Sequence, residues 1–210
     1  MLAYIQGNLS NPQSTLAMQQ LPSTTPQPQH ENRYPDCLYM ELQAIPVNSD
    51  QIDLPVTMHF NEQWEALGTV RVKFGVKGGQ LKLKLKNCEI PDDSRELDGQ
   101  IELKQAVCQV TTNGSKSHPT WEFELSIGAT VLIGSLQNQK LGTVQLQDRP
   151  CSVEATFEVS QQYVHLMATE GLYPTDTSRN KQIILEALFR KELLKSKLQP
   201  YLSRAELHYG

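Results

Sequence analysis

Short runs of alternating apolar and polar residues fill the middle of the chain, from about residue 37 to residue 171. Alternation with a period of two places successive side chains on opposite faces of a β-strand. Turn-forming Gly, Pro, Asn and Asp separate the runs, and no helical pattern interrupts them, so parallel βαβ units are not expected. The predicted strands are 37–45, 55–61, 69–76, 80–89, 100–112, 120–133, 141–147, 152–159 and 163–169.

This series predicts an all-β fold: an antiparallel two-sheet sandwich of about nine strands, with a barrel as the second choice. The predicted β-sandwich covers residues 36–172. Residues 1–35 are rich in Pro, Gln, Ser and Thr and can bury too little apolar surface to offset their ordering entropy. We therefore expect a polar N-terminal arm that is flexible unless it is bound.

Residues 173–210 form a C-terminal segment with a helical period, so we expect an amphipathic helix after the sandwich. Thr177 or Ser178 can cap its start. Pro200 interrupts the pattern and fits the first position of a further short helix. The helix carries two apolar stripes, one formed by Ile184, Ala187, Leu188, Leu194 and Leu198 and the other by Leu185, Phe189 and Leu193.

Two stripes make a wider apolar arc than a helix packed on one surface usually has. One interpretation is a helix packed firmly on the sandwich. The other is a helix that contacts the sandwich on one side and a second protein on the other. The second interpretation makes Leu185, Phe189 and Leu193 candidate partner-binding residues.

The sequence KFGVKGGQLKLKLKNCEI, residues 73–90, alternates lysine with leucine. Gly78-Gly79 predicts a two-residue hairpin turn, because both positions accept a positive φ. Pairing residues across that turn gives an apolar face of Val72, Phe74, Val76, Leu81, Leu83 and Leu85. The opposite face then carries six cations, which are Arg71, Lys73, Lys77, Lys82, Lys84 and Lys86.

Directly opposed like charges destabilise a strand pair, so this predicted lysine face calls for nearby anions. The strands that carry Glu122 with Glu124, and Glu154 with Glu158, would supply them if they lie beside the lysines. The alternatives are a protein partner with an acidic face, or a polyanion. A net charge of −4 and the lack of interleaved aromatic residues disfavour nucleic acid.

No residue spacing typical of catalysis or metal binding occurs among the five histidines and four cysteines. Nucleophile-elbow, phosphate-loop and dinucleotide fingerprints are also absent from the sequence. We therefore predict a protein that is not an enzyme and needs no cofactor or metal. Asp92, Asp93, Glu96 and Asp98 form the best candidate ion site, but Arg95 lies among them and a solvated loop is the preferred interpretation.

The cysteines fall in or beside apolar runs, so we expect reduced, buried thiols and a cytoplasmic location, with one or two disulfides as the alternative. No apolar run is long enough to span a membrane, and the first residues do not resemble a secretory signal. These observations favour a structural or adaptor subunit of a larger assembly, which binds partners through the arm, the helix and the lysine face. The alternatives are a ligand-binding sandwich for carbohydrate or another polymer, and anion or nucleic-acid binding.

Overall fold

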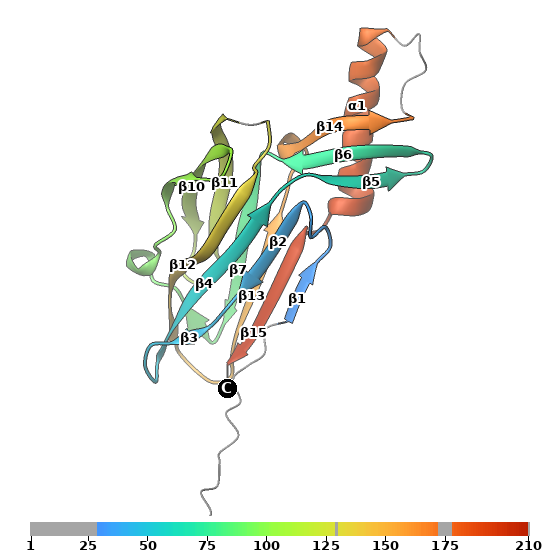
Figure 1. Cartoon of the computed structure of the whole chain (residues 1–210). Helices are drawn as coiled ribbons and strands as arrows, with labels where there is room; N and C mark the ends of the chain where they lie inside the picture. The colour runs from blue at the N-terminus through green and yellow to red at the C-terminus, as the bar shows by residue number, and fades with distance from the viewer. Residues whose placement is uncertain (1–28, 129, 172–177, 210) are drawn as a thin grey trace, which may run out of the picture.

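The computed structural model describes residues 29–128, 130–171 and 178–209 (Figure 1). Within these residues the chain forms three sheets, and every strand pair is antiparallel. The prediction of an all-β sandwich with a C-terminal helix is confirmed.

The largest sheet has seven strands. Their order is β1 (Gln29–Asn32), β15 (Ser203–Tyr209), β13 (Cys151–Glu158), β7 (Gly78–Lys86), β11 (Pro119–Gly128), β10 (Ala106–Gly114) and β9 (Gly99–Glu102). The sheet thus joins the earliest and the latest strands that the structure describes.

A five-stranded sheet packs against the large one. It has the order β2 (Leu38–Leu42), β4 (Gln51–Phe60), β12 (Gly134–Leu146) and β8 (Cys88–Glu89), with β3 (Ile45–Pro46) also paired to β4. A smaller sheet contains β14 (Val164–Glu170), β6 (Val70–Val76) and β5 (Gln63–Leu67). Two short 3-10 turns are η1 (Asp92–Ser94) and η2 (Gln161–Tyr163).

The helical segment consists of α1 (Arg179–Leu193) and a π-helical turn, η3 (Leu194–Leu198). Ser178 is the N-cap residue of α1, although its side chain makes no capping hydrogen bond. Figure 1 shows that α1 crosses the strands of the small sheet and projects beyond the body of the molecule.

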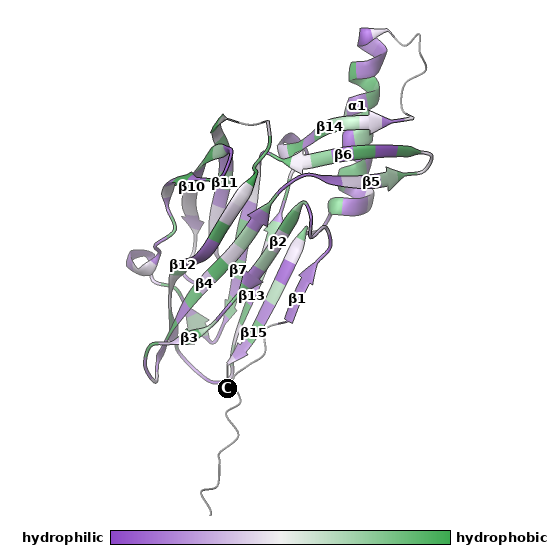
Figure 2. Ribbon diagram, viewed as in Figure 1, coloured by the Kyte–Doolittle hydropathy of each residue, from purple (hydrophilic) through white to green (hydrophobic). Residues whose placement is uncertain are grey.

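The core lies between the two larger sheets, and it follows directly from the alternation in the sequence. Figure 2 shows hydrophobic and hydrophilic positions alternating along the strands. Phe60 from the five-stranded sheet meets Phe123 and Phe157 from the seven-stranded sheet, with ring centroids 6.1 and 5.9 Å away. Tilted and edge-to-face aromatic contacts at this distance stabilise a core beyond the area that they bury.

The predicted hairpin across Gly78-Gly79 is wrong. Strand β6 pairs with β14 and β5, whereas β7 begins at Gly78 and lies between β13 and β11. Neither glycine has a positive φ. A Cβ on Gly79 would lie 2.5 Å from the Phe157 ring, and one on Gly78 would lie 2.2 Å from the carbonyl oxygen of Phe123. These glycines therefore permit close packing and do not form a turn.

Several strand predictions also need correction. The single strand expected over 100–112 is divided into β9 and β10, and β1, β5 and β15 were not predicted. The short helix expected after Pro200 is wrong, because Ser203–Tyr209 forms β15. Residues 29–35, placed in the predicted arm, contain β1 and the buried Tyr34, whereas residues 1–28 lie outside the described residues.

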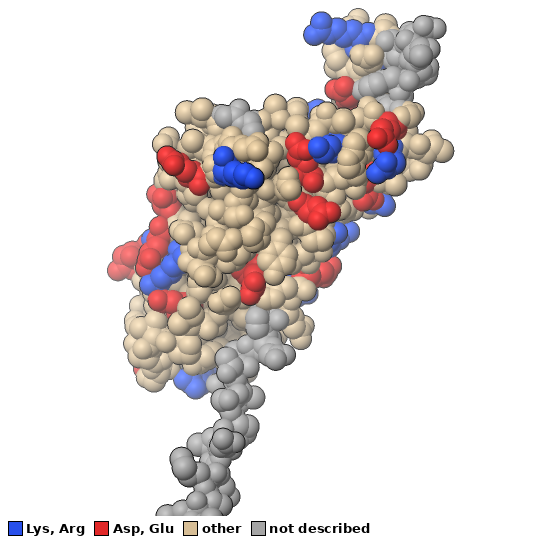
Figure 3. Space-filling view, in the orientation of Figure 1, with Lys and Arg blue, Asp and Glu red and all other residues tan. Residues whose placement is uncertain are grey.

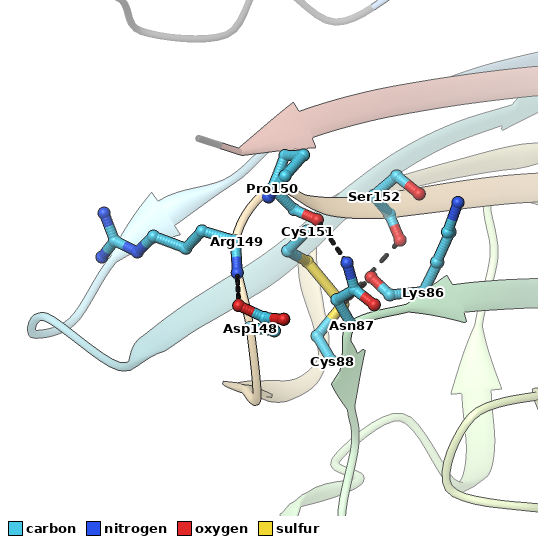
Figure 4. The surroundings of a disulfide bond; sticks show 8 residues. All are labelled: Lys86, Asn87, Cys88, Asp148, Arg149, Pro150, Cys151 and Ser152. Carbon is cyan, nitrogen blue, oxygen red and sulfur yellow. Dashed lines mark hydrogen bonds between the residues drawn. A yellow bond between two sulfur atoms is a disulfide. The ribbon is translucent and has the colours of Figure 1, made fainter.

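A disulfide joins Cys88 in β8 to Cys151 in β13 and so connects the two larger sheets (Figure 4). The expectation of reduced thiols is therefore wrong for this pair. Cys88 and Cys151 are distant in sequence, but Ser152 pairs with Lys86, which brings the two cysteines together. Cys37 and Cys108 are free and buried, and burial raises the pKa of their thiols to about 12 and about 11, respectively.

Candidate interaction surfaces

The six cations of the predicted lysine face do not share a face, because β6 and β7 belong to different sheets. Arg71 and Lys73 lie on β6, where Arg71 Nη1 is 2.9 Å from Glu170 Oε2 and Lys73 forms an ion pair with Glu62. Lys77 lies between the two strands, and its backbone bonds to Tyr163 and Leu125.

Lys82, Lys84 and Lys86 do share the outer face of the seven-stranded sheet. Lys82 Nζ is 2.6 Å from Glu158 Oε2, and Lys84 stands opposite Glu154 in the register. Opposite charges in such cross-strand positions stabilise a sheet. The interpretation in which neighbouring glutamates neutralise the lysines is therefore confirmed for Lys82.

The helix buries one side and exposes another, and the division differs from the predicted stripes. Leu193 is fully buried, so its predicted contact with a partner is wrong, and Leu185 and Phe189 are half-buried. Leu194 and Leu198 fall in η3, where the chain no longer follows the 3.6-residue period, and both are buried.

Exposed aliphatic side chains occur within the first ten residues of α1. Ile183, Ile184 and Leu188 have 57%, 60% and 56% of their surface exposed. Ile184 and Leu188 belong to the first predicted stripe, but Ile183 belongs to neither. The sequence could not show which stripe would face solvent, because both stripes are equally apolar.

The opposite end of the helical segment is fixed to the body. Lys197 Nζ is 3.0 Å from Glu65 Oε1 on β5. Near α1, His165 of β14 lies in a partly buried position beside Lys77, Arg190 and Glu186, and burial is the main cause that lowers its pKa, followed by the two cations. The attachment thus lies along the later turns of α1 and in η3, away from Ile183 and Ile184.

A hollow of about 450 Å³ lies beside the exposed aliphatic residues. It is lined by Leu188, Phe189, Lys191, Glu192 and Lys195. Two apolar side chains therefore border a space whose remaining lining is charged and mainly basic.

The helical segment also differs in charge from the rest of the chain. Residues 179–198 contain six Lys or Arg and two Glu, a net charge of +4, whereas the whole chain carries −4. Figure 3 shows acidic and basic side chains intermixed over the visible face of the body, and basic side chains at the projecting end of the helix. Such an asymmetry favours contacts between the helix and an acidic surface.

The acidic loop residues do not converge on an ion site. Asp92 pairs with Arg95 at 2.8 Å, Glu96 pairs with Lys140 at 2.8 Å, and Asp98 accepts a hydrogen bond from the backbone of Thr112. In the described ranges, no group of three or more His, Cys, Asp or Glu residues is arranged to hold a metal ion. Asp92, Glu96 and Asp98 thus serve as structural partners of neighbouring groups.

One pairing of histidine with serine occurs on the outer face of the five-stranded sheet. His59 Nδ1 is 2.7 Å from Ser135 Oγ, and Gln137 Nε2 is 3.4 Å from His59 Nε2. These hydrogen bonds are solvent-exposed. If Gln137 donates to Nε2, the ring proton lies on Nδ1 and faces Ser135, an arrangement in which the histidine cannot accept the serine proton.

Comparisons with known proteins add no functional assignment. No protein-family description matches the chain, and no curated protein is significantly similar to it. Among the helices that the structure describes, none combines the length and apolar character needed to cross a membrane.

Proposed function

We propose that the chain is a non-enzymatic structural or adaptor subunit of a larger assembly, and that it binds a partner protein through the exposed aliphatic side chains of α1. The observation that carries this proposal is the exposure of Ile183, Ile184 and Leu188 on consecutive turns of one helix. Single exposed aliphatic residues are common on protein surfaces, but adjoining ones typically mark interaction sites.

The energetics of this face support a binding role. Full burial of one large aliphatic side chain contributes about 1.5–3 kcal/mol, so a partner that covers Ile184 and Leu188 gains a useful part of a binding free energy. An isolated helix of this length is also marginally stable in water. A partner that covers these turns would therefore stabilise the helix as well as bind it.

The lysines of the seven-stranded sheet are weaker candidates. Lys82 already has a partner within the chain, and an exposed ion pair contributes only about 0–1 kcal/mol. Lys84 and Lys86 remain available for a secondary contact. The cytoplasmic location expected from the sequence stays a prediction.

The test compares two pairs of exposed aliphatic residues in the full chain. Ile184→Asp with Leu188→Asp alters the helix, whereas Ile45→Asp with Val47→Asp is a matched control, because Ile45 and Val47 have similar exposure at 52% and 53%. Each tagged protein is recovered from its native cells and its complexes are measured by native mass spectrometry.

We expect the wild type and the control to form the same stoichiometric complex, and the helix variant to be recovered alone with unchanged circular dichroism. Recovery of the wild type as a monomer without a partner would show that the proposed function is wrong. Retention of the complex by the helix variant would show that α1 is not the binding site.

A further inference from the structure

We infer that the partner segment inserts a bulky apolar side chain into the hollow beside Leu188 and Phe189, and that Asp or Glu residues flank this anchor. This inference rests on the proposed function and specifies the chemistry of the partner. It follows from the shape of the hollow, the charge on its rim, and the arrangement of lysines along the exposed face of α1.

The hollow suits an anchor side chain. Its volume of about 450 Å³ lies beside the exposed Leu188 and the half-buried Phe189. The residues that dominate protein interfaces are large side chains that fill such spaces and lose contact with water. Leu, Ile, Phe or Trp on the partner would therefore contribute most of the binding free energy here.

The rim of the hollow specifies the residues around the anchor. Lys191 and Lys195 line it, and helical spacing places Lys181, Ile184, Leu188 and Lys191 along one face of α1. Within the described part of the chain, none of these three lysines forms an ion pair. Carboxylates beside the anchor would meet them, and such complementarity excludes basic or neutral competitors.

A second copy of the chain is a poor occupant of this face. If two copies of α1 packed antiparallel about Leu188, Lys181 of each helix would approach Lys195 of the other. Like charges at close spacing repel, and Glu192 is the single acidic residue among those that line the hollow. The basic face therefore favours a different, acidic partner over self-association.

An anionic membrane surface would also attract lysines and aliphatic side chains. The structure favours a protein segment, because the apolar exposure covers about two helical turns and adjoins a hollow of about 450 Å³. Helices that lie in a membrane interface normally present an apolar face along their whole length. Vesicle binding is therefore an outcome of the test.

The test begins with selection of random short peptides on the full-length protein, with counter-selection on the full-length Leu188→Asp variant. We expect the enriched peptides to contain Leu, Ile, Phe or Trp with Asp or Glu within one helical turn. Fluorescence anisotropy then measures the affinity of an enriched peptide. Affinity should fall about tenfold or more in the Lys191→Glu/Lys195→Glu variant and should decrease as salt rises.

The matched control is Lys84→Glu/Lys86→Glu, which makes the same charge change on the seven-stranded sheet and should leave peptide affinity unchanged. Enrichment of peptides without acidic residues, equal binding by the Lys191→Glu/Lys195→Glu variant, or no enrichment over Leu188→Asp would each overturn the inference. So would Leu188-dependent binding to vesicles of phosphatidylserine and phosphatidylcholine in place of peptides.

The inference and the proposed function can fail separately. A native complex that depends on Ile184 and Leu188 but tolerates Lys191→Glu/Lys195→Glu would leave the proposed function intact and overturn the acidic-anchor inference. A chain that forms no native complex but selects acidic peptides in a Leu188-dependent manner would support the chemistry of the hollow and overturn the proposed function.

Discussion

Removal of the disulfide between Cys88 and Cys151 should substantially reduce the stability of the fold. The bond joins residues separated by 63 positions in the sequence and connects the five-stranded to the seven-stranded sheet. On the chain-entropy account, a cross-link over a loop of this length lowers the entropy of the unfolded chain by about 14 cal/mol/K, or about 4 kcal/mol at 25 °C. That is a large fraction of the 5–15 kcal/mol that typically stabilises a domain.

The measurement is urea unfolding with and without dithiothreitol, followed by fluorescence of the fully buried Trp121. We expect the free energy of unfolding to fall by about 4 kcal/mol on reduction. The m-value should rise, because the reduced unfolded chain exposes more surface. The Cys88→Ala/Cys151→Ala variant is the control and should resemble the reduced protein whether or not dithiothreitol is present.

A count of thiols provides an independent check. The denatured, unreduced protein should contain two reactive thiols, from Cys37 and Cys108, and the reduced protein should contain four. Four thiols before reduction, or the same urea midpoint with and without dithiothreitol, would refute this reasoning.

Three further predictions follow from the packing of single residues. In the native protein at about pH 8, iodoacetamide should leave Cys37 and Cys108 unmodified, because burial raises the pKa of their thiols to about 12 and about 11. Intact-protein mass spectrometry measures the number of modified thiols, and rapid modification would contradict the prediction. Gly79→Ala should lower the free energy of unfolding by about 1–3 kcal/mol, because the Cβ of the alanine would lie 2.5 Å from the Phe157 ring. Urea unfolding measures the loss, and a smaller loss in a Phe157→Leu background would identify this contact as the cause. His165 has a pKa below its ordinary value of 6.5 in the folded protein, mainly through burial. Its contribution to stability is therefore present above pH 6.5 and is lost as the pH falls through the folded pKa. His165→Asn should reduce the slope of the free energy of unfolding against pH in this range, and an unchanged slope would exclude this residue as the source.

The sequence predicted which residues form the core more reliably than it predicted which strands are neighbours. Leu81, Leu83 and Leu85 are buried as their alternation indicates, because the period of a strand is a local property. Which strands lie beside that strand depends on whether Gly78-Gly79 forms a turn or permits close packing, and glycine serves both purposes. The backbone of Phe123 and the ring of Phe157 distinguish these two uses, and both residues are remote in the sequence.

The candidate interaction surface was predicted in part. The excess of apolar residues on the helix indicated two faces, but the π-helical turn at η3 and the attachment through Lys197 decide which face is covered. The attachment is a tertiary contact with Glu65 of β5, which is remote in the sequence. The missed strand β15 had a usable signal, since Ala205 and Leu207 alternate with Arg204, Glu206 and His208, but Pro200 and the preceding helical period favoured a helix.

The place of β15 in the seven-stranded sheet has a consequence for the order in which the protein is built. This strand lies between β13 and β1, and it pairs Glu206 with both Glu154 and Gln29. While the ribosome is still making the chain, β13 therefore has an open edge and β1 has no strand to join. Contacts so distant in sequence form slowly, and an incomplete sheet edge invites pairing with other chains. The nascent protein should thus be most prone to aggregation just before residues 203–209 emerge.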